Sequence, residues 1–166
     1  MPADLQVERV DWNDPRAVAQ RDAMNAETGA MYAKFTEGNS PEMNAAVDEA
    51  LTVDPAEILD TILVVEGDEV LGHSALRQAP GFGAEVLEVK KVFVGDAYRG
   101  RGAARLLMAE LEAIAKQRGA TSLVLQTGDL QVPAIALYKD IGYVAIPTYG
   151  KYVVMPNALC YRKELV

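Results

Sequence analysis

The chain is poor in the residues that build disulfides and metal sites. Cys160 is the only cysteine among 166 residues, so no intrachain disulfide can form, and the cytoplasm is the simplest location. His73 is the only histidine, and no His, Cys, Asp or Glu residues have the spacing of metal ligands, so we expect no metal. Because neither residue has a catalytic partner nearby in sequence, we expect His73 to be structural and Cys160 to be a small buried hydrophobic residue.

Long apolar runs and positive charge are also lacking. No apolar run reaches the length that spans a bilayer, and the charged-then-apolar start of a signal peptide is missing, so we expect no membrane partner. With 16 basic and 24 acidic residues, the formal net charge of −8 argues against general nucleic-acid binding. Hydrophobic residues make up 50% and charged residues 24%, as in soluble globular proteins. We expect one domain over residues 1–166.

Period-two and helical patterns alternate along the chain and predict an α/β fold. The order is β-α-α-β-β-β-α-β-α-β-β, which we expect to form a mixed sheet. The expected strands are 5–12, 61–65, 70–76, 84–94, 122–126, 143–146 and 158–163. The expected helices are 15–35, a short one from 40, 101–118 and 131–141. Asp14 is the expected N-cap of the first helix, with Pro15 at its first position. We expect strand 122–126 to run parallel to Val92–Val94, because a helix connects them.

The helix over residues 101–118 has a clear apolar stripe. Its members are spaced to lie on one buried face: Ala104, Leu107, Met108, Leu111 and Ala115. Gly119 follows the last of them and is the expected C-terminal stop.

A basic, glycine-containing loop joins the apolar strand that ends at Val94 to this helix. Gly100 and Gly102 alternate there with Arg99 and Arg101, and Arg105 follows in the first turn, in a chain that is acidic as a whole. A helix N-terminus offers unpaired N–H groups and the positive end of the helix dipole. The loop therefore predicts a seat for an anion such as a pyrophosphate.

The loop reads Arg99-Gly100-Arg101-Gly102-Ala103-Ala104, and a second motif, Gln131-Val132-Pro133-Ala134-Ile135-Ala136-Leu137-Tyr138, is followed by Gly142-Tyr143. Together, and in this order, they resemble the two signatures of the GNAT superfamily of acetyl-CoA-dependent N-acetyltransferases. The stretch Ile146–Tyr152 is similar to the tail of one subgroup. The resemblance covers essentially the whole chain. It implies a single domain with a central mixed, mostly antiparallel twisted sheet and helices on both faces.

The resemblance also implies an activity, which is direct transfer of an acetyl group from acetyl-CoA to a primary amine without an acyl-enzyme. The strand ending at Val94 would part from strand 122–126, and the pantetheine arm would lie against Val92, Phe93 and Val94. A free N–H of Phe93 or Val94 would then serve as the oxyanion donor. The pyrophosphate would take the N–H groups of Arg101, Gly102, Ala103 and Ala104, with Arg99 adding charge and Gly100 and Gly102 leaving room. Gln131 and Ala134 of the second motif complete the expected cofactor residues.

Two catalytic roles follow from the same resemblance. Tyr138 is the expected general acid, because a phenol stays protonated at neutral pH; without the motif it would be read as a core residue. Glu88 is the expected general base, directly or through water, with Glu85 as a rival and water alone as a third possibility. Without the resemblance, Glu88 would be read as an exposed strand carboxylate beside Lys90 and Lys91.

The expected acceptor is a small and potentially cationic amine, and the sequence does not identify which one. An acidic rim is expected from Asp22, Glu27, Glu37, Glu42, Asp48 and Glu49. Two residues depart from the family pattern: Gln131 replaces a common asparagine, and Gln126 replaces a glutamate common in the subgroup. The second departure removes a carboxylate that could hold a cationic substrate. Alternatives are a longer acyl donor, a protein amine acceptor or a non-catalytic CoA-binding sensor or partner module; the chain could be a monomer or a homodimer.

Overall fold

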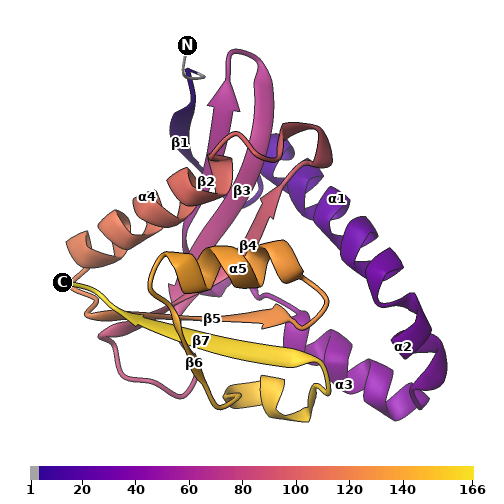
Figure 1. Ribbon diagram of the computed structural model, residues 1–166. Coiled ribbons are helices and arrows are strands. Elements are labelled where there is room, and N and C mark those ends of the chain that lie inside the picture. The colour runs from indigo at the N-terminus through magenta and orange to yellow at the C-terminus, as the bar shows by residue number, and fades with distance from the viewer. Residues whose placement is uncertain (1–3) are drawn as a thin grey trace.

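The computed structural model describes residues 4–166 and contains one seven-stranded sheet of order β1-β2-β3-β4-β5-β7-β6 (Figure 1). The strands are β1 (Gln6–Val10), β2 (Ile58–Glu66), β3 (Glu69–Gln78), β4 (Val86–Val94), β5 (Ser122–Gly128), β6 (Val144–Ile146) and β7 (Ala158–Glu164). All neighbours are antiparallel except β4 and β5. The predicted mixed, mostly antiparallel α/β fold is confirmed. The single-domain assignment stays a prediction, and its residues 1–3 lie outside the described part.

Five helices and three short 3-10 turns connect the strands. The helices are α1 (Pro15–Met31), α2 (Ala33–Gly38), α3 (Pro41–Leu51), α4 (Ala103–Gln117) and α5 (Val132–Asp140). The 3-10 turns are η1 (Pro55–Glu57), η2 (Asp96–Tyr98) and η3 (Gly150–Val154). Within residues 4–166, no helix is long and apolar enough to cross a membrane.

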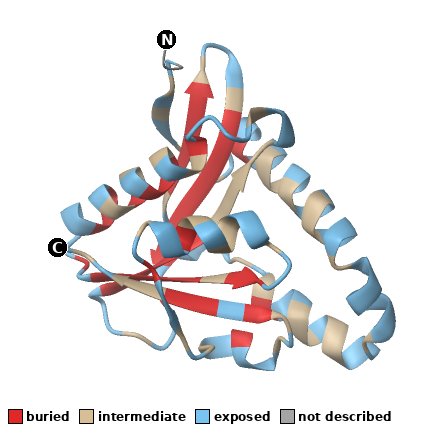
Figure 2. Ribbon diagram, viewed as in Figure 1, coloured by how far each residue is buried: buried red, intermediate tan, exposed pale blue. Residues whose placement is uncertain are grey.

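Helices cover both faces of the sheet. Successive side chains of β2 point to opposite faces and pack against different helices. Ile62 and Val64 belong to the main core, which also contains the buried side of α4. Leu63 and Val65 point the other way and pack against Ala17 of α1. The alternation follows from the two-residue period of a strand. Figure 2 shows the buried residues concentrated in the sheet, including β2, β3 and β5, and on one side of α4.

The first predicted helix is divided into two. Asp14 caps α1 by accepting from the N–H of Arg16, as the Asp-Pro pair predicted, but α1 ends at Met31 instead of Phe35. Tyr32 then interrupts the helix with φ −101° and ψ 11°, and α2 begins after it. The hydroxyl of Thr28 donates to the carbonyl of Met24, a side-chain bond that bends helices. The apolar spacing alone did not indicate this bend.

The buried stripe of α4 lacks one predicted member and includes two residues that were not predicted. Leu107, Met108, Leu111 and Ala115 are buried as expected, together with Ala103 and Ile114, whereas Ala104 is partly exposed. The helix begins at Ala103 and not at Arg101, and Ala103 lies one turn before Leu107 on the buried face. Gly119 follows the helix with φ +87°, as expected for a C-terminal stop.

Strands β4 and β5 pair over only part of their length. Val86–Val89 pairs with Ser122–Leu125, so the predicted parallel direction of the two strands is confirmed, and the pairing ends before Val92. Against β3, β4 carries one extra residue, since His73 lies opposite Phe93 and Ala75 opposite Lys90. Lys91 lies in this bulge with φ +55°. The two strands then diverge, as the resemblance implied, with β4 rising in Figure 1 and β5 lying across it.

Candidate active site

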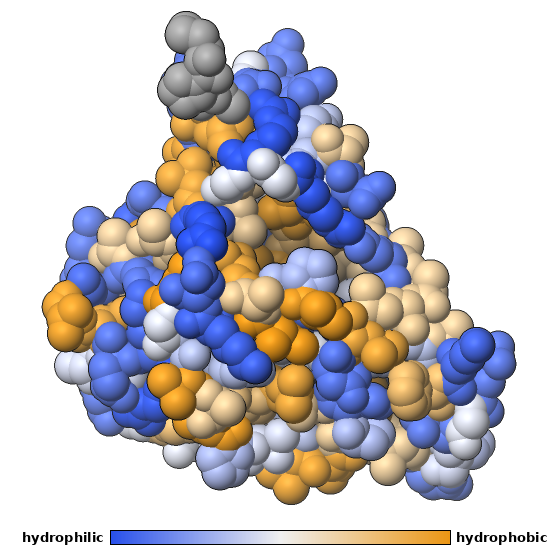
Figure 3. Space-filling model, viewed as in Figure 1, coloured by the Kyte–Doolittle hydropathy of each residue, from blue (hydrophilic) through white to orange (hydrophobic). Residues whose placement is uncertain are grey.

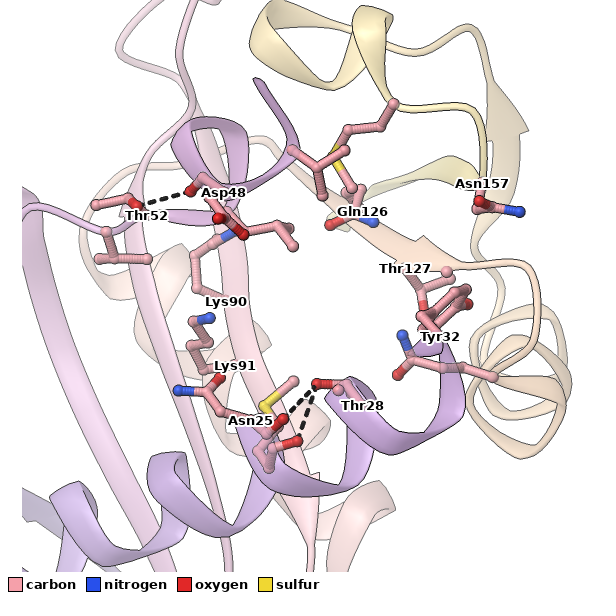
Figure 4. Close-up of a pocket in the computed structure, with 18 of the residues that line it drawn as sticks. Asn25, Thr28, Tyr32, Asp48, Thr52, Lys90, Lys91, Gln126, Thr127 and Asn157 are labelled. Atoms are coloured by element: carbon pink, nitrogen blue, oxygen red, sulfur yellow. Dashed lines mark hydrogen bonds between the residues drawn. The ribbon is translucent and has the colours of Figure 1, made fainter. Parts of the chain in front are cut away.

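A cavity of about 700 Å³ lies where β4 and β5 part, between the sheet and the α1–α3 segment (Figure 4). From β4 it is lined by Val89, Lys90, Lys91 and Val92, and from β5 by Leu125, Gln126, Thr127 and Gly128. The opposite wall comes from α1, α2 and α3, and Gln131 and Tyr138 line the cavity from the α5 region. The two halves of the sheet and the helices before β2 thus meet around one space.

The predicted cofactor residues lie around this cavity but not all in its wall. Val92 and Gln131 line it. Phe93, Val94 and residues 99–104 do not, and Ala134 packs against the main core. On the face that Figure 3 shows, apolar residues gather in the middle around α5, where Leu130 and Val132 are exposed.

The loop before α4 presents a row of free N–H groups. No acceptor among residues 4–166 takes a hydrogen bond from the backbone N–H groups of residues 99–105; the first N–H bonded in the helix is that of Leu106, to Gly102. Gly100 and Gly102 have φ of +80° and +84°, a conformation that other residues adopt at a cost. A Cβ at either glycine would meet nothing within 4 Å, so backbone conformation and not space calls for glycine here.

The arginines of this loop are bonded to carboxylates. Arg99 contacts Glu27 at 2.6 Å and Arg101 contacts Glu66 at 2.7 Å, while Arg105 pairs with Asp140. The expected positive charge is therefore largely balanced within the chain. The N–H row is the part of the loop that has no partner in residues 4–166.

The register of β3 and β4 decides which backbone N–H faces the divergence. Residues opposite one another in antiparallel strands alternate between hydrogen-bonded and non-hydrogen-bonded pairs. Gly95 N–H donates to the carbonyl of Leu71 at 2.9 Å, so the register makes Phe93 and His73 the next bonded pair. Val94 lies between these pairs, and its N–H points to the side that β5 has left. Of the two expected donors, Phe93 therefore faces β3 and Val94 faces the divergence.

Tyr138 is both a core residue and a cavity residue. It is 5% exposed, packs edge-on to Tyr143 with ring centroids 5.9 Å apart, and lines the cavity. No hydrogen-bond partner for its hydroxyl lies within the described chain. Burial raises the pKa of this phenol well above its ordinary value. The hydroxyl therefore holds its proton at neutral pH.

The two carboxylates expected as general base are not in the cavity wall. Glu88 is fully buried, which corrects its reading as an exposed strand residue. It accepts from Arg77 Nε at 2.6 Å and from the Tyr149 hydroxyl at 2.5 Å. Glu85 is exposed before the start of β4, at the other end from the bulge. This geometry gives Glu88 a buried ion pair and brings neither carboxylate to the wall of the cavity.

We expect Glu88→Gln to lower the free energy of unfolding by about 3 kcal/mol, because it removes the buried carboxylate at 2.6 Å from Arg77 and leaves this guanidinium only the exposed Glu57 at 3.7 Å. Urea denaturation measures this, with the exposed Glu85→Gln as matched control, expected within about 0.5 kcal/mol of wild type. A stable Glu88→Gln variant that loses about 100-fold in kcat would instead support the base role.

The sequence analysis did not identify the cationic side chains of the cavity wall as functional residues. Arg21 reaches the cavity from α1, and Lys91 from the β4 bulge. The imidazole of His73 connects them, because its Nδ1 contacts the carbonyl of Lys91 at 2.9 Å and its Nε2 contacts an Arg21 nitrogen at 3.0 Å. Lys90, also in the wall, donates to the Tyr152 hydroxyl at 2.7 Å, and burial lowers its pKa to about 8. The one sequence signal was a pair of lysines inside an apolar strand.

His73 should make stability depend on pH. Burial lowers its pKa from 6.5 to about 4, so between these values the unfolded chain binds a proton that the folded chain does not. The stabilisation is complete above pH 6.5 and is lost as the pH falls to 4. Between pH 6.5 and pH 4, we expect the free energy of unfolding of wild type to fall by about 3 kcal/mol more than that of His73→Gln. Urea unfolding at several pH values tests this, and parallel curves for the two proteins would contradict it.

The expected acidic rim is only partly present. Asp22 and Asp48 line the cavity, whereas Glu27 pairs with Arg99, Glu49 pairs with Lys151, and Glu37 and Glu42 do not line it. The charged residues of the wall are three cations and two carboxylates: Arg21, Lys90, Lys91, Asp22 and Asp48. The cavity is therefore locally positive in a chain of formal net charge −8.

Cys160 behaves as the small hydrophobic residue expected of it. It is 2% exposed and packs with Ala50, Tyr152 and Ala158, and burial raises its thiol pKa to about 11. Within residues 4–166, no three or more His, Cys, Asp or Glu residues are grouped so that they could hold a metal ion.

Comparisons with known proteins agree with this architecture. The family model described as "Acetyltransferase (GNAT) family" matches residues 21–143. An IAA acetyltransferase of Azospirillum brasilense is 34% identical over 94 residues, covering 57% of this chain and 59% of that protein. The chain spans between 35% and 64% of the length of the curated relatives it matches.

Solved structures share the fold. A Klebsiella pneumoniae protein assigned as an acyl-CoA N-acyltransferase superposes with a TM-score of 0.75 at 23% identity, covering 98% of this chain and 99% of that one. A GNAT family acetyltransferase from Elizabethkingia anophelis, solved with acetyl-CoA bound, has a TM-score of 0.64 at 15% identity over 98% and 99% of the two chains. By its family match over most of its length, the chain belongs to the GNAT family of acetyltransferases.

Proposed function

We propose that this protein transfers an acetyl group from acetyl-CoA to the primary amine of a small molecule, with both substrates bound together. The observation that carries the proposal is the divergence of β4 and β5, which leaves the Val94 N–H free beside a cavity that Tyr138 lines. The names of relatives support it, since several curated relatives are called N-acetyltransferases.

The chain offers suitable groups for acetyl-CoA. The free N–H groups of Arg101, Gly102, Ala103 and Ala104 would hold the diphosphate, as helix N-termini hold anions. The backbone of Val92–Val94 on the open side of β4 would hold the pantetheine amides, and the exposed Leu130 and Val132 offer apolar surface nearby. When bound, acetyl-CoA supplies an activated acetyl thioester.

Three features of the chain would act on the reaction. The Val94 N–H is placed to donate to a developing oxyanion, and one such donor is worth about 3–4 kcal/mol in the best-studied case. The Tyr138 hydroxyl, protonated at neutral pH, would give its proton to the leaving thiolate, and the proton that the attacking nitrogen loses would restore it. Lys90 and Lys91 disfavour a further positive charge in the cavity, so an amine would bind there neutral after losing its proton to water.

A thiol-release assay with acetyl-CoA and a panel of primary amines tests the proposal, together with thermal unfolding in the presence of acetyl-CoA or CoA. Acetyl transfer predicts a higher melting temperature with either ligand and amine-dependent release of free CoA. A higher melting temperature without thiol release from any amine would indicate a non-catalytic binding module. No effect of either ligand would overturn the proposal.

A further inference from the structure

Arg21 is a cation that the chain holds firmly without an acidic partner. Its guanidinium carbon lies 3.5 Å from the centre of the Trp12 ring, and one terminal nitrogen donates to the Trp12 carbonyl at 2.6 Å. The other terminal nitrogen lies 3.0 Å from His73 Nε2. An aromatic face, a carbonyl and a neutral imidazole thus fix this guanidinium in the cavity wall.

His73 ties Arg21 to the bulge of β4. Its Nδ1 lies 2.9 Å from the carbonyl of Lys91 and so carries the hydrogen, which leaves Nε2 to accept from Arg21. Lys91 itself has φ +55° and lines the same cavity (Figure 4). The bulge residue and the helix residue are therefore positioned by one buried side chain.

Neither cation has a counter-charge in contact. No carboxylate oxygen within residues 4–166 lies within 4.0 Å of a nitrogen of Arg21 or Lys91. Asp22, which also lines the cavity, acts on Arg21 only from farther away. Burial lowers the pKa of both cations, because charge is costly where water is partly excluded. A bound anion would remove this cost.

Arg21 also has donors to spare. A guanidinium carries five N–H groups in a planar fork, and the Trp12 carbonyl and His73 use two of them. Planar forks match carboxylates. The N–H row proposed for the CoA diphosphate, residues 101–104, lies outside the cavity wall that contains Arg21 and Lys91. An anion at Arg21 would therefore belong to the acceptor.

We propose that Arg21 and Lys91 bind the carboxylate of the acceptor, so that the substrate is an amine that also carries a carboxylate, such as an amino acid. This deepens the proposed function and rests on it. His73 acts as a positioning residue for both cations.

Paired acceptors test the proposal. Methionine, phenylalanine and glutamine are each compared with their own carboxamides at saturating acetyl-CoA, by thiol release. An amide has the less basic amine, so a preference for the acid cannot come from amine deprotonation. We expect kcat/KM to favour the acids by about 10- to 100-fold, chiefly through KM, since a hydrogen bond to a charged group is worth about that factor.

Lys91→Met should lower this preference by about 10-fold, because it removes one charge and keeps the length of the side chain. The matched control is Lys34→Met, which makes the same change of net charge at an exposed residue near the cavity but outside its wall. The control should keep the wild-type preference. Equal rates for acids and amides in wild type would overturn the proposal and leave acetyl transfer standing.

If no acceptor is acetylated, a binding measurement tests the proposed carboxylate site. In that case the proposed function fails, and thermal unfolding with each acid and amide tests the carboxylate site by itself. Stabilisation by an acid, absent with its amide and lost in Lys91→Met, would support the site. Equal stabilisation by both compounds, or none with either, would overturn it.

Discussion

Replacing Tyr138 by phenylalanine is expected to lower kcat by about 10²- to 10⁴-fold, the usual contribution of a general acid. The ring remains and keeps its edge-on contact with Tyr143, so the fold and the cavity shape should be preserved. The hydroxyl that is removed has no partner in residues 4–166, so little stability should be lost. Stopped assays of acetyl transfer measure kcat, and thermal unfolding with CoA checks that the ligand still binds.

Tyr143→Phe is the matched control for this variant. Tyr143 is also a buried phenol of the main core, but its hydroxyl donates to Glu112 at 3.2 Å instead of lining the cavity. Its loss should cost stability, about 1 kcal/mol, and leave kcat near the wild-type value. Full activity in Tyr138→Phe would remove Tyr138 from the mechanism.

Gly102→Glu is expected to abolish the stabilisation of the protein by acetyl-CoA. The new carboxylate stands at the row of free N–H groups, and a residue with a Cβ at φ +84° tends to move that row. A ligand at about 100 times its Kd adds about 2.7 kcal/mol, or about 5–10 °C in melting temperature. If the variant binds about 100-fold more weakly, the same concentration adds only about 0.4 kcal/mol.

Gly119→Glu separates this effect from backbone strain. Gly119 has φ +87° and open space at its Cβ position, like Gly102, but it follows the other end of the same helix. Both variants add one negative charge and one strained residue, which costs about 1–2 kcal/mol. Only Gly102→Glu should lose the thermal response to acetyl-CoA. Equal losses in both variants would contradict a ligand seat at the α4 N-terminus.

Much of the fold could be predicted because its signals are local. Asp14 and Pro15 begin α1, Gly119 ends the α4 segment, and alternation marked the strands. The bend at Tyr32 and the bulge at Lys91 could not be predicted, because each depends on bonds made by the folded chain.

The sequence motifs predicted the parts of the candidate site that lie within one short segment. They did not predict the parts in which side chains from distant segments come into contact. Tyr138 and the Gly100–Ala104 loop were found by motif, and their roles remain proposals. The burial of Glu88 beside Arg77 could not be predicted, because a glutamate in a strand gives no sign of which partner it meets and Arg77 lies on another strand. Arg21 was missed because Trp12 and His73, which hold it, are distant in sequence from one another.

In the proposed function, different elements would serve the two substrates. The groups proposed for acetyl-CoA come from β4, α4 and α5, and one wall of the cavity proposed for the acceptor comes from α1, α2 and α3. Helices α4 and α1 pack on opposite faces of β2 and share no core cluster. Apart from Glu27, which pairs with Arg99, residues on α1–α3 could therefore be exchanged for others that fit a different amine while the groups proposed for acetyl-CoA are left intact. In evolutionary terms, the proposed function would combine a constant acetyl-CoA site with a replaceable acceptor wall.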